Sequence, residues 1–331
     1  MVPKELYITL DYELFLNDLT GDVDSCLIKP TEKFLELTNN YGVKATFFVD
    51  ASYLYRLREL GRVYPILEKD YEKVTTQVRR ISEQGHCIAL HIHPQWFYSD
   101  FDGENWTMDF DHYKLSDMPQ DLADTKFVQC LNLLEDLSHS KIKAYRAGGY
   151  SIQGYKSFPD ILVKNGIIYD SSVLCGMKNL SKLHYFDYSI INRTTIYTFD
   201  NDVLHPNKEG KGAIKEFPIT TAKLPFLQYC YLKIKNRGIK SNRNWGNGGD
   251  LPTKRSKGFL NSLLKKMGKP VWALASIDYQ SFSFSDYVLK KNAARSSCIV
   301  MIGHPKNFSP ASLSYLEDLI KRGFYSFKTI Q

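Results

Sequence analysis

Two pairs of polar side chains lie at positions i and i+2 in segments that otherwise read as buried strands. Asp11 and Glu13 occur in ELYITLDYEL, and His91 and His93 occur in HCIALHIHP. Side chains two residues apart on a strand point to the same face, so each pair can meet at one point. Neighbouring carboxylates resist burial without a cation between them, and two imidazoles with a carboxylate commonly bind a divalent metal ion. The pairs predict a metal site; the alternative is an exposed strand end with hydrogen-bonded core histidines.

Arg146 ends the segment KIKAYRA and is followed by Gly148 and Gly149. Glycines let the backbone approach a ligand closely and can present N–H donors to an anion. A guanidinium group can hold a carboxylate such as that of Asp11 in a fixed orientation. The alternative is an ordinary tight turn.

Two weaker candidates follow other apolar runs. His304 comes after SSCIVMIG and before Pro305, and a histidine in that place can act as a general acid. Asp170, in IIYDSSV, ends a neighbouring predicted strand and can position a substrate or another side chain.

The order of the predicted elements indicates how these residues are positioned. Apolar runs predict strands, and segments of helical periodicity alternate with them. The predicted strands are 5–15, 44–51, 86–94, 141–150, 167–173, 213–220 and 296–305, and the predicted helices are 30–42, 65–84, 121–138, 157–166 and 309–323. Such alternation favours a parallel sheet with right-handed crossovers. The candidate residues follow strand ends, where a (β/α) barrel builds its active site.

The composition is that of a globular protein. Of 331 residues, 43% are apolar and 24% are charged, which allows a sizeable core and excludes wholesale disorder. No apolar run reaches the roughly 18 residues that a membrane span needs. The first apolar stretch contains acidic residues, unlike a signal peptide. We therefore expect a cytoplasmic protein.

The positive charge is concentrated in one segment. Residues Lys223–Lys269 contain twelve Lys or Arg and one acid, whereas the rest of the chain has a net charge of −4. The part from 238 to 258 reads as a long loop, and 258–269 reads as an amphipathic helix. The segment is either a solvated surface or a surface that meets anionic lipid or a phosphate-bearing substrate. We expect no nucleic-acid partner, because no recognisable nucleic-acid module accompanies the charge.

Taken in order, these segments resemble the polysaccharide deacetylases of the NodB homology type, also called carbohydrate esterase family 4. ITLDYEL, GVKATFFVDA, GHCIALHIHPQW, AYRAGGY, YDSSV and MIGHP are similar to the family's motifs, from about residue 7 to residue 305. The resemblance implies an α/β fold, a distorted and incomplete (β/α) barrel. It also implies a single domain over residues 1–331, with a basic insertion at about 223–269.

The motifs depart from the family pattern at two points. Tyr12 stands where the family has its metal-binding aspartate, and Glu13 is the available substitute. Gln95 stands where the family has its second metal histidine, and His93 is the available replacement. These DxE and HxHPxW variants resemble a subgroup that accompanies bacterial surface-polysaccharide genes.

The resemblance implies a metal-dependent removal of N-acetyl groups from an amino sugar. Glu13, His91 and His93 would hold one divalent ion, with zinc expected and cobalt, nickel or manganese as alternatives. Asp11 would act as the general base, oriented by Arg146. His304 would act as the general acid, oriented by Asp170. A backbone N–H of Gly149 or Tyr150 would bind the oxyanion, and Trp96 would stack on a sugar ring.

Two other functions remain open at this point. One is a metal-independent amidase on the same fold, and the other is a non-catalytic carbohydrate-binding or membrane-surface protein. An intracellular deacetylase would act on a precursor, for which a lipid-linked saccharide at the inner membrane surface is the expected form. A soluble nucleotide sugar is the alternative substrate.

Overall fold

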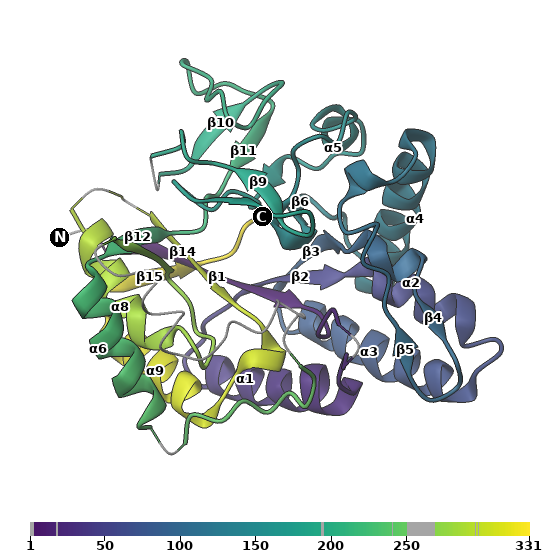
Figure 1. The fold of residues 1–331 in the computed structure, drawn as a ribbon, viewed down its shortest axis with the longest axis horizontal. Coiled ribbons are helices and arrows are strands. Elements are labelled where there is room, and N and C mark those ends of the chain that lie inside the picture. The colour runs from purple at the N-terminus through teal and green to yellow at the C-terminus, as the bar shows by residue number, and fades with distance from the viewer. Residues whose placement is uncertain are drawn as a thin grey trace.

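The computed structural model describes residues 3–17, 19–192, 195–239, 241–249, 269–294, 296 and 298–331. Within these ranges, nine strands form one curved sheet in the order β10-β11-β7-β6-β3-β2-β1-β14, with β15 beside the first half of β1. Only β10 and β11 are antiparallel; the other pairs of this sheet are parallel. Helices pack beside the sheet (Figure 1).

The elements have the following bounds. The sheet consists of β1 Lys4–Tyr12, β2 Thr46–Asp50, β3 Cys87–Ile92, β6 Ala144–Ala147, β7 Tyr169–Asp170, β10 Tyr197–Phe199, β11 Ile214–Glu216, β14 Cys298–Gly303 and β15 Tyr325–Lys328. The helices are α1 Lys29–Asn40, α2 Ala51–Leu60, α3 Pro65–Glu83, α4 Gln120–Ser138, α5 Asp160–Lys164, α6 Phe226–Arg237, α8 Phe282–Asn292 and α9 Pro310–Lys321. Small two-stranded sheets pair β4 Asp100–Phe101 with β5 Trp106–Thr107, β8 Lys178–Leu180 with β9 Tyr185–Asp187, and β12 Thr221–Leu224 with β13 Val271–Leu274.

The central strands are apolar because both of their faces are buried. All residues of β14 are buried, as are those of β1 from Leu6 onward. A parallel sheet covered on both faces gives such near-continuous apolar runs. Helix α3 instead buries one stripe, which contains Leu67, Val74, Val78 and Ile81. These two patterns are the reason that strands and helices could be distinguished in the sequence.

The sheet curls toward a barrel without closing. Residues 217–220 cross from the β7 side of the sheet toward β14. The N–H of Phe217 donates to Asp170 O at 2.8 Å, and the N–H of Thr220 donates to Val300 O at 3.0 Å. The predicted incomplete (β/α) barrel is therefore confirmed, with an irregular segment in place of further strands.

Apart from the helix predicted at 258–269, each predicted strand and helix coincides with an observed one, but several elements were not predicted. Helix α2 begins directly at the end of β2, where the Asp50 side chain accepts a hydrogen bond from the N–H of Tyr53. No loop separates the two patterns there. Helices α6 and α8 and strand β15 were also missed. The predicted helix at 258–269 lies almost wholly outside the described residues, which do not include 250–268.

No helix in the described part of the chain combines the length and the apolar character needed to span a membrane.

Candidate active site

The carboxyl ends of the parallel strands surround a cavity of about 210 Å³. It is lined by Asp11, Glu13, Phe15, Leu16, His91, His93, Tyr113, Gly149, Tyr150, His184, Gly249, His304, Lys306 and Asn307. Most of the residues predicted to do chemistry are among them. The strand ends thus meet at one edge of the sheet, as expected for this architecture.

The register of the strands explains which side chains meet. Asp50 on β2 is paired with His91 on β3, and His91 is paired with Arg146 on β6. On β1, Tyr12 is paired with Val49, so the next residue, Glu13, lies beside Asp50 and extends the row of residues that are adjacent across the strands. Residues in one row of a parallel sheet point to the same face. The curled sheet therefore directs this row of polar side chains to its inner face.

Glu13, His91 and His93 form a compact cluster of possible metal ligands. One ligand atom from each lies within 4.8 Å of the others, and all three residues are buried. Glu13 Oε2 is 3.1 Å from His91 Nε2 and 3.2 Å from His93 Nδ1. His91 Nδ1 is 2.7 Å from the carbonyl oxygen of Arg146. Since that oxygen can only accept, Nδ1 carries the proton and Nε2 is left facing Glu13.

Asp11 is held by Arg146, as the sequence suggested. Arg146 Nη1 donates to Asp11 Oδ1, and Arg146 is fully buried. Its other donors are also used: Nη2 bonds to Thr9 Oγ1 at 2.9 Å, and Nε bonds to Ser171 O at 2.8 Å. The guanidinium group is therefore fixed on several sides and orients the Asp11 carboxylate.

His304 lies next to Asp11 but is oriented by a residue that the sequence analysis missed. His304 Nε2 is 3.6 Å from Asp11 Oδ2 and 3.9 Å from Glu13 Oε1. Asp278 accepts from the backbone N–H of His304 at 2.7 Å and from Nδ1 at 2.8 Å. Burial alone would lower the pKa of His304, but Asp278 above all, followed by Asp11 and Glu13, raises that pKa to about 9. His304 is therefore a protonated group aimed into the cavity at neutral pH.

The prediction that Asp170 orients His304 is wrong. Asp170 is paired in register with Tyr145 and Glu216, one position before Arg146 and Ser171, so it points to the opposite face of the sheet. Its Oδ1 accepts from Ser172 Oγ at 2.7 Å. Burial, and after it the adjacent Asp170, raises the pKa of Glu216 well above the ordinary value. Asp170 supports the loop behind Arg146 instead.

Trp96 also has a different place from the predicted one. It is fully buried and packs between Tyr53 and Trp106, so no sugar can stack on it. Its indole N–H donates to Asp50 Oδ2 at 2.9 Å, and the same oxygen is 3.2 Å from His93 Nδ1. Trp96 therefore fixes Asp50, which in turn fixes His93.

Lys306 brings a second buried cation to the cavity. Its Nζ donates to Glu13 Oε1 at 2.8 Å and to the carbonyl oxygen of Leu14 at 2.7 Å. Burial would raise the pKa of Glu13, but Lys306, then His93 and His91, holds it well below the ordinary value. Because Lys306 uses Oε1, Oε2 remains directed at the two histidines.

Tyr12 and Gln95, the two residues that depart from the family pattern, both lie outside the cavity. Tyr12 points away from the cavity, and its hydroxyl donates to Gln77 Oε1 on α3 at 2.8 Å. Gln95 is fully buried and does not line the cavity. Glu13 and His93 are the residues that face His91, as expected from the sequence.

One wall of the cavity is formed by the turn after β6. Gly149 and Tyr150 line the cavity and have φ values of 57° and 63°. A Cβ atom on Gly149 would lie 2.4 Å from the Tyr113 ring, so no larger residue fits without displacement. Tyr113 Oη is 3.4 Å from Nε2 of His184, a residue that the sequence analysis did not single out.

The beginning of the long loop in the basic segment reaches the same cavity. Gly249 lines it, and the N–H of Gly249 donates to Leu19 O at 2.9 Å. The N–H of Trp245 donates to Phe308 O at 3.0 Å, beside the His304 loop. The described part of this loop, 241–249, therefore lies on the active-site side of the sheet.

Asp50, Asp278 and Lys306 are the main residues that sequence reasoning missed. Asp50 and Asp278 both follow apolar runs, TFFV and VWALASI, which is the same signal that identified Asp170. Lys306 is two residues after His304. The apolar run before Asp50 and before Asp278 was visible in the sequence, but it does not tell which polar residues at strand ends face the cavity.

Comparison with known proteins agrees with this architecture. The family model described as polysaccharide deacetylase matches residues 4–156. A crystal structure of a Mycobacterium smegmatis protein assigned as a polysaccharide deacetylase has a TM-score of 0.50 and 13% identity, and the match covers 97% of this chain and 85% of that chain. A polysaccharide deacetylase from Bacillus cereus has a TM-score of 0.42 and 13% identity, over 99% of this chain and 92% of that chain. No curated protein matches the chain by sequence.

The contact between Asp278 and His304 can be tested by titration. We expect the His304 imidazole to titrate with a pKa of about 9. Asp278→Asn should lower that pKa toward the ordinary value of about 6.5, because the variant removes the main negative charge beside the ring. Since the folded-state pKa is raised, this histidine stabilises the fold fully below about pH 6.5 and loses that effect as the pH rises through about 9.

Nuclear magnetic resonance titration of the His304 ring signals measures the shift directly. Asp202→Asn is a matched control, because Asp202 contacts the exposed His205 in the same way, at 2.9 Å. An unchanged His304 pKa in Asp278→Asn would contradict the assignment.

Proposed function

Because the chain belongs to the polysaccharide deacetylase family, whose members are hydrolases of amide bonds, we propose that it removes N-acetyl groups from an amino sugar. The proposal rests on one observation above all. The Asp11–Arg146 pair, the Glu13, His91 and His93 cluster and the protonated His304 all face one cavity of about 210 Å³. Base, acid and metal ligands are thus within reach of one amide group.

The residues of the cluster fit a divalent metal ion. Two histidines and a carboxylate are a suitable donor set for zinc, with cobalt, nickel and manganese as alternatives. His91 donates its other ring N–H to a backbone carbonyl, the usual second contact of a metal-ligating histidine. An ion held by Glu13, His91 and His93 would polarise the amide carbonyl and lower the pKa of a bound water.

The proton transfers are assigned to this chain's own side chains. Asp11, oriented by Arg146, accepts a proton from the attacking water. Protonated His304 donates from Nε2 to the nitrogen of the leaving amine as the carbon–nitrogen bond breaks. The products are acetate and the free amine. A backbone N–H of Gly149 or Tyr150, which both line the cavity, would stabilise the negative charge that develops on the amide oxygen.

A metal-independent amidase is the second candidate, and Lys306 is the observation that favours it. Its ammonium group already neutralises Glu13 at 2.8 Å inside the cavity. A fixed cation there could stabilise developing negative charge in place of a metal ion. Metal analysis separates the two candidates.

We expect the purified protein to contain one divalent metal ion per chain. Glu13→Gln and His91→Ala should each lose most of it, because each removes one of three ligands. Burial opposes protonation of His91, but Glu13, then Asp11 and Asp50, raises its pKa. Protons should therefore compete with the metal, and occupancy should fall as the pH is lowered.

Elemental analysis of dialysed protein gives the occupancy. His205→Ala serves as the control, since this histidine is exposed and lies outside the cavity. Metal-free protein with full turnover would overturn the metal assignment and favour the amidase. Metal that survives both ligand substitutions would place the ion elsewhere.

Asp11→Asn should fold and keep its metal but lose turnover by about 10²–10⁴-fold, the usual effect of removing a general base. An asparagine preserves the shape of the side chain but cannot accept the proton of the attacking water. Asp111→Asn is the control, because Asp111 is exposed and pairs with Lys182 outside the cavity. Turnover on a small acetylated sugar and metal content are measured together. Loss of metal with an intact fold would make Asp11 a ligand and exchange its role with that of Glu13.

We further propose that the substrate is a lipid-linked precursor of a bacterial surface polysaccharide, reached from the cytoplasmic side of the membrane. Helix α6, within the basic segment, supports contact with a membrane. Leu227, Tyr231 and Ile234 share one face of α6 and have exposed fractions of 79%, 61% and 62%. Lys235 and Arg237 follow in the last turn. An exposed apolar stripe with basic residues is typical of helices that lie in a membrane interface.

Binding to liposomes tests this location. The protein should co-sediment with anionic liposomes at low salt and be released at high salt, since each basic residue near an anionic surface contributes about 1 kcal/mol. Leu227→Gln with Ile234→Gln should weaken binding, whereas Val63→Gln, at a site with a 68% exposed side chain outside α6, should not. Binding that is absent, or that ignores lipid charge and salt, would contradict the proposal and leave a soluble nucleotide sugar as the substrate candidate.

A further inference from the structure

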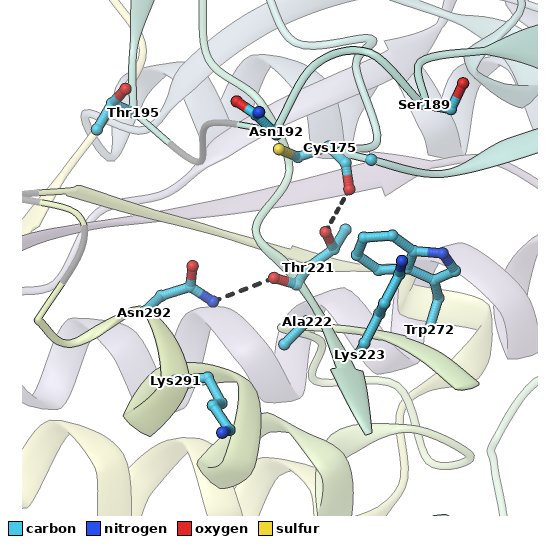
Figure 2. A pocket seen from close by; sticks show the side chains of 11 residues that line it. Cys175, Ser189, Asn192, Thr195, Thr221, Ala222, Lys223, Trp272, Lys291 and Asn292 are labelled. Carbon is cyan, nitrogen blue, oxygen red and sulfur yellow. Dashed lines mark hydrogen bonds between the residues drawn. The ribbon is translucent and has the colours of Figure 1, made fainter. Parts of the chain in front are cut away.

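A second and larger cavity lies apart from the catalytic one. Its volume is about 670 Å³, within the usual range for small-molecule sites. Five separate parts of the chain line it: residues 175 and 176, residues 189, 192 and 195, residues 221–223 on β12, residue 272 on β13, and residues 291 and 292 at the end of α8. It shares no lining residue with the catalytic cavity in the described part of the chain. Figure 2 shows how these segments surround it.

The inner part of this cavity is held in shape by hydrogen bonds and close packing. Thr221 Oγ1 donates to Cys175 O, and Asn292 Nδ2 donates to Thr221 O at 3.1 Å (Figure 2). Gly176 has a φ of 73°, and a Cβ atom there would lie 2.5 Å from the Trp272 ring. The indole therefore packs directly on the backbone. Such a floor is formed before any ligand arrives, which reduces the entropy cost of binding.

The walls combine an aromatic ring, hydroxyl and amide groups, and positive charge. Lys223 is paired with Trp272 in register, and its Nζ is 4.9 Å from the centroid of the ring. Lys291 lines another side of the cavity, where its Nζ is 5.6 Å from the centroid of the Tyr287 ring on the same helix. Neither lysine has an ion-pair partner among the described residues, and no Asp or Glu is among the described residues of the lining. Ser189, Asn192 and Thr195 supply polar groups on the loop after β9.

We propose that this cavity binds an anionic saccharide, such as a segment that carries uronic acid carboxylates. An indole surface suits the C–H face of a sugar ring. Hydroxyl and amide side chains suit its hydroxyl groups, and the two lysines suit a carboxylate. The site goes beyond the proposed reaction, because binding here requires no chemistry and no acetyl group. It would hold a part of a polymer that is remote from the bond being cut.

Calorimetric titration of the full chain tests the site with a galacturonic acid trisaccharide, which has negative charge but no acetyl group. Maltotriose is the neutral probe, and inorganic phosphate is the simple anion. We expect the acidic trisaccharide to bind at least about tenfold more tightly than maltotriose. Lys223→Ala with Lys291→Ala should weaken it at least about tenfold, and Trp272→Ala should also weaken it. The matched control is Lys33→Ala with Lys164→Ala, which removes two exposed lysines elsewhere.

The outcomes separate this site from the catalytic one. Asp11→Asn should bind the trisaccharide as wild type does, and the double Lys223 and Lys291 variant should keep wild-type turnover on a small acetylated sugar. Loss of trisaccharide binding in Asp11→Asn would place the probe in the catalytic cavity and overturn the proposal. The proposal would also be overturned if maltotriose bound as tightly as the acidic trisaccharide. The same holds if inorganic phosphate bound as tightly as the trisaccharide and Trp272→Ala did not change its affinity. These readouts do not depend on whether the chain deacetylates sugars.

Discussion

The guanidinium group of Arg146 joins the strands that form the catalytic cavity. It is fully buried, bonds to Asp11 and Thr9 on β1 and to Ser171 after β7, and lies 4.0 Å from the ring centroid of Phe48 on β2. Leaving one partner of a buried ion pair uncompensated typically costs about 3–5 kcal/mol. The same contacts that make the buried charge tolerable therefore also fix the orientation of Asp11.

The other charged residues of the cavity are paired, and in each pair one residue orients the other or sets its protonation. Lys306 neutralises one oxygen of Glu13 and leaves the other toward the histidines. Asp278 keeps the proton on His304, whereas Asp50 fixes the ring of His93. In a water-poor site such oriented charges act more strongly than they would in solvent. Each candidate catalytic group thus has a neighbour that sets its protonation or direction.

The cavity also depends on residues that carry no chemistry. Asp170 and Glu216 are paired in register on the opposite face of the sheet, and the N–H of Val173 donates to Glu216 Oε1 at 3.1 Å. Ser172 connects this pair to the backbone N–H of Ala147, the residue after Arg146, at 2.9 Å. The buried acid pair therefore supports the catalytic strand from behind.

The sequence by itself determined the alternation of strands and helices and the polar residues at strand ends. Apolar runs and helical periodicity are local properties, so they do not need the fold to be visible. The i, i+2 spacing of Asp11 with Glu13 and of His91 with His93 was enough to put each pair on one face. That is why the cluster of Glu13, His91 and His93 could be predicted.

Only the tertiary structure decided which strand-end residues face inward and which partners they find. The register between strands places Asp170 on the outer face and Asp50 on the inner face, although both follow apolar runs. A shift of one residue reverses the face of every side chain on a strand, and register depends on contacts that are distant in sequence. Asp278 reaches His304, and Lys306 reaches Glu13, across 26 and 293 positions of the chain. Such contacts exist only once the sheet has curled and brought its first and last strands together.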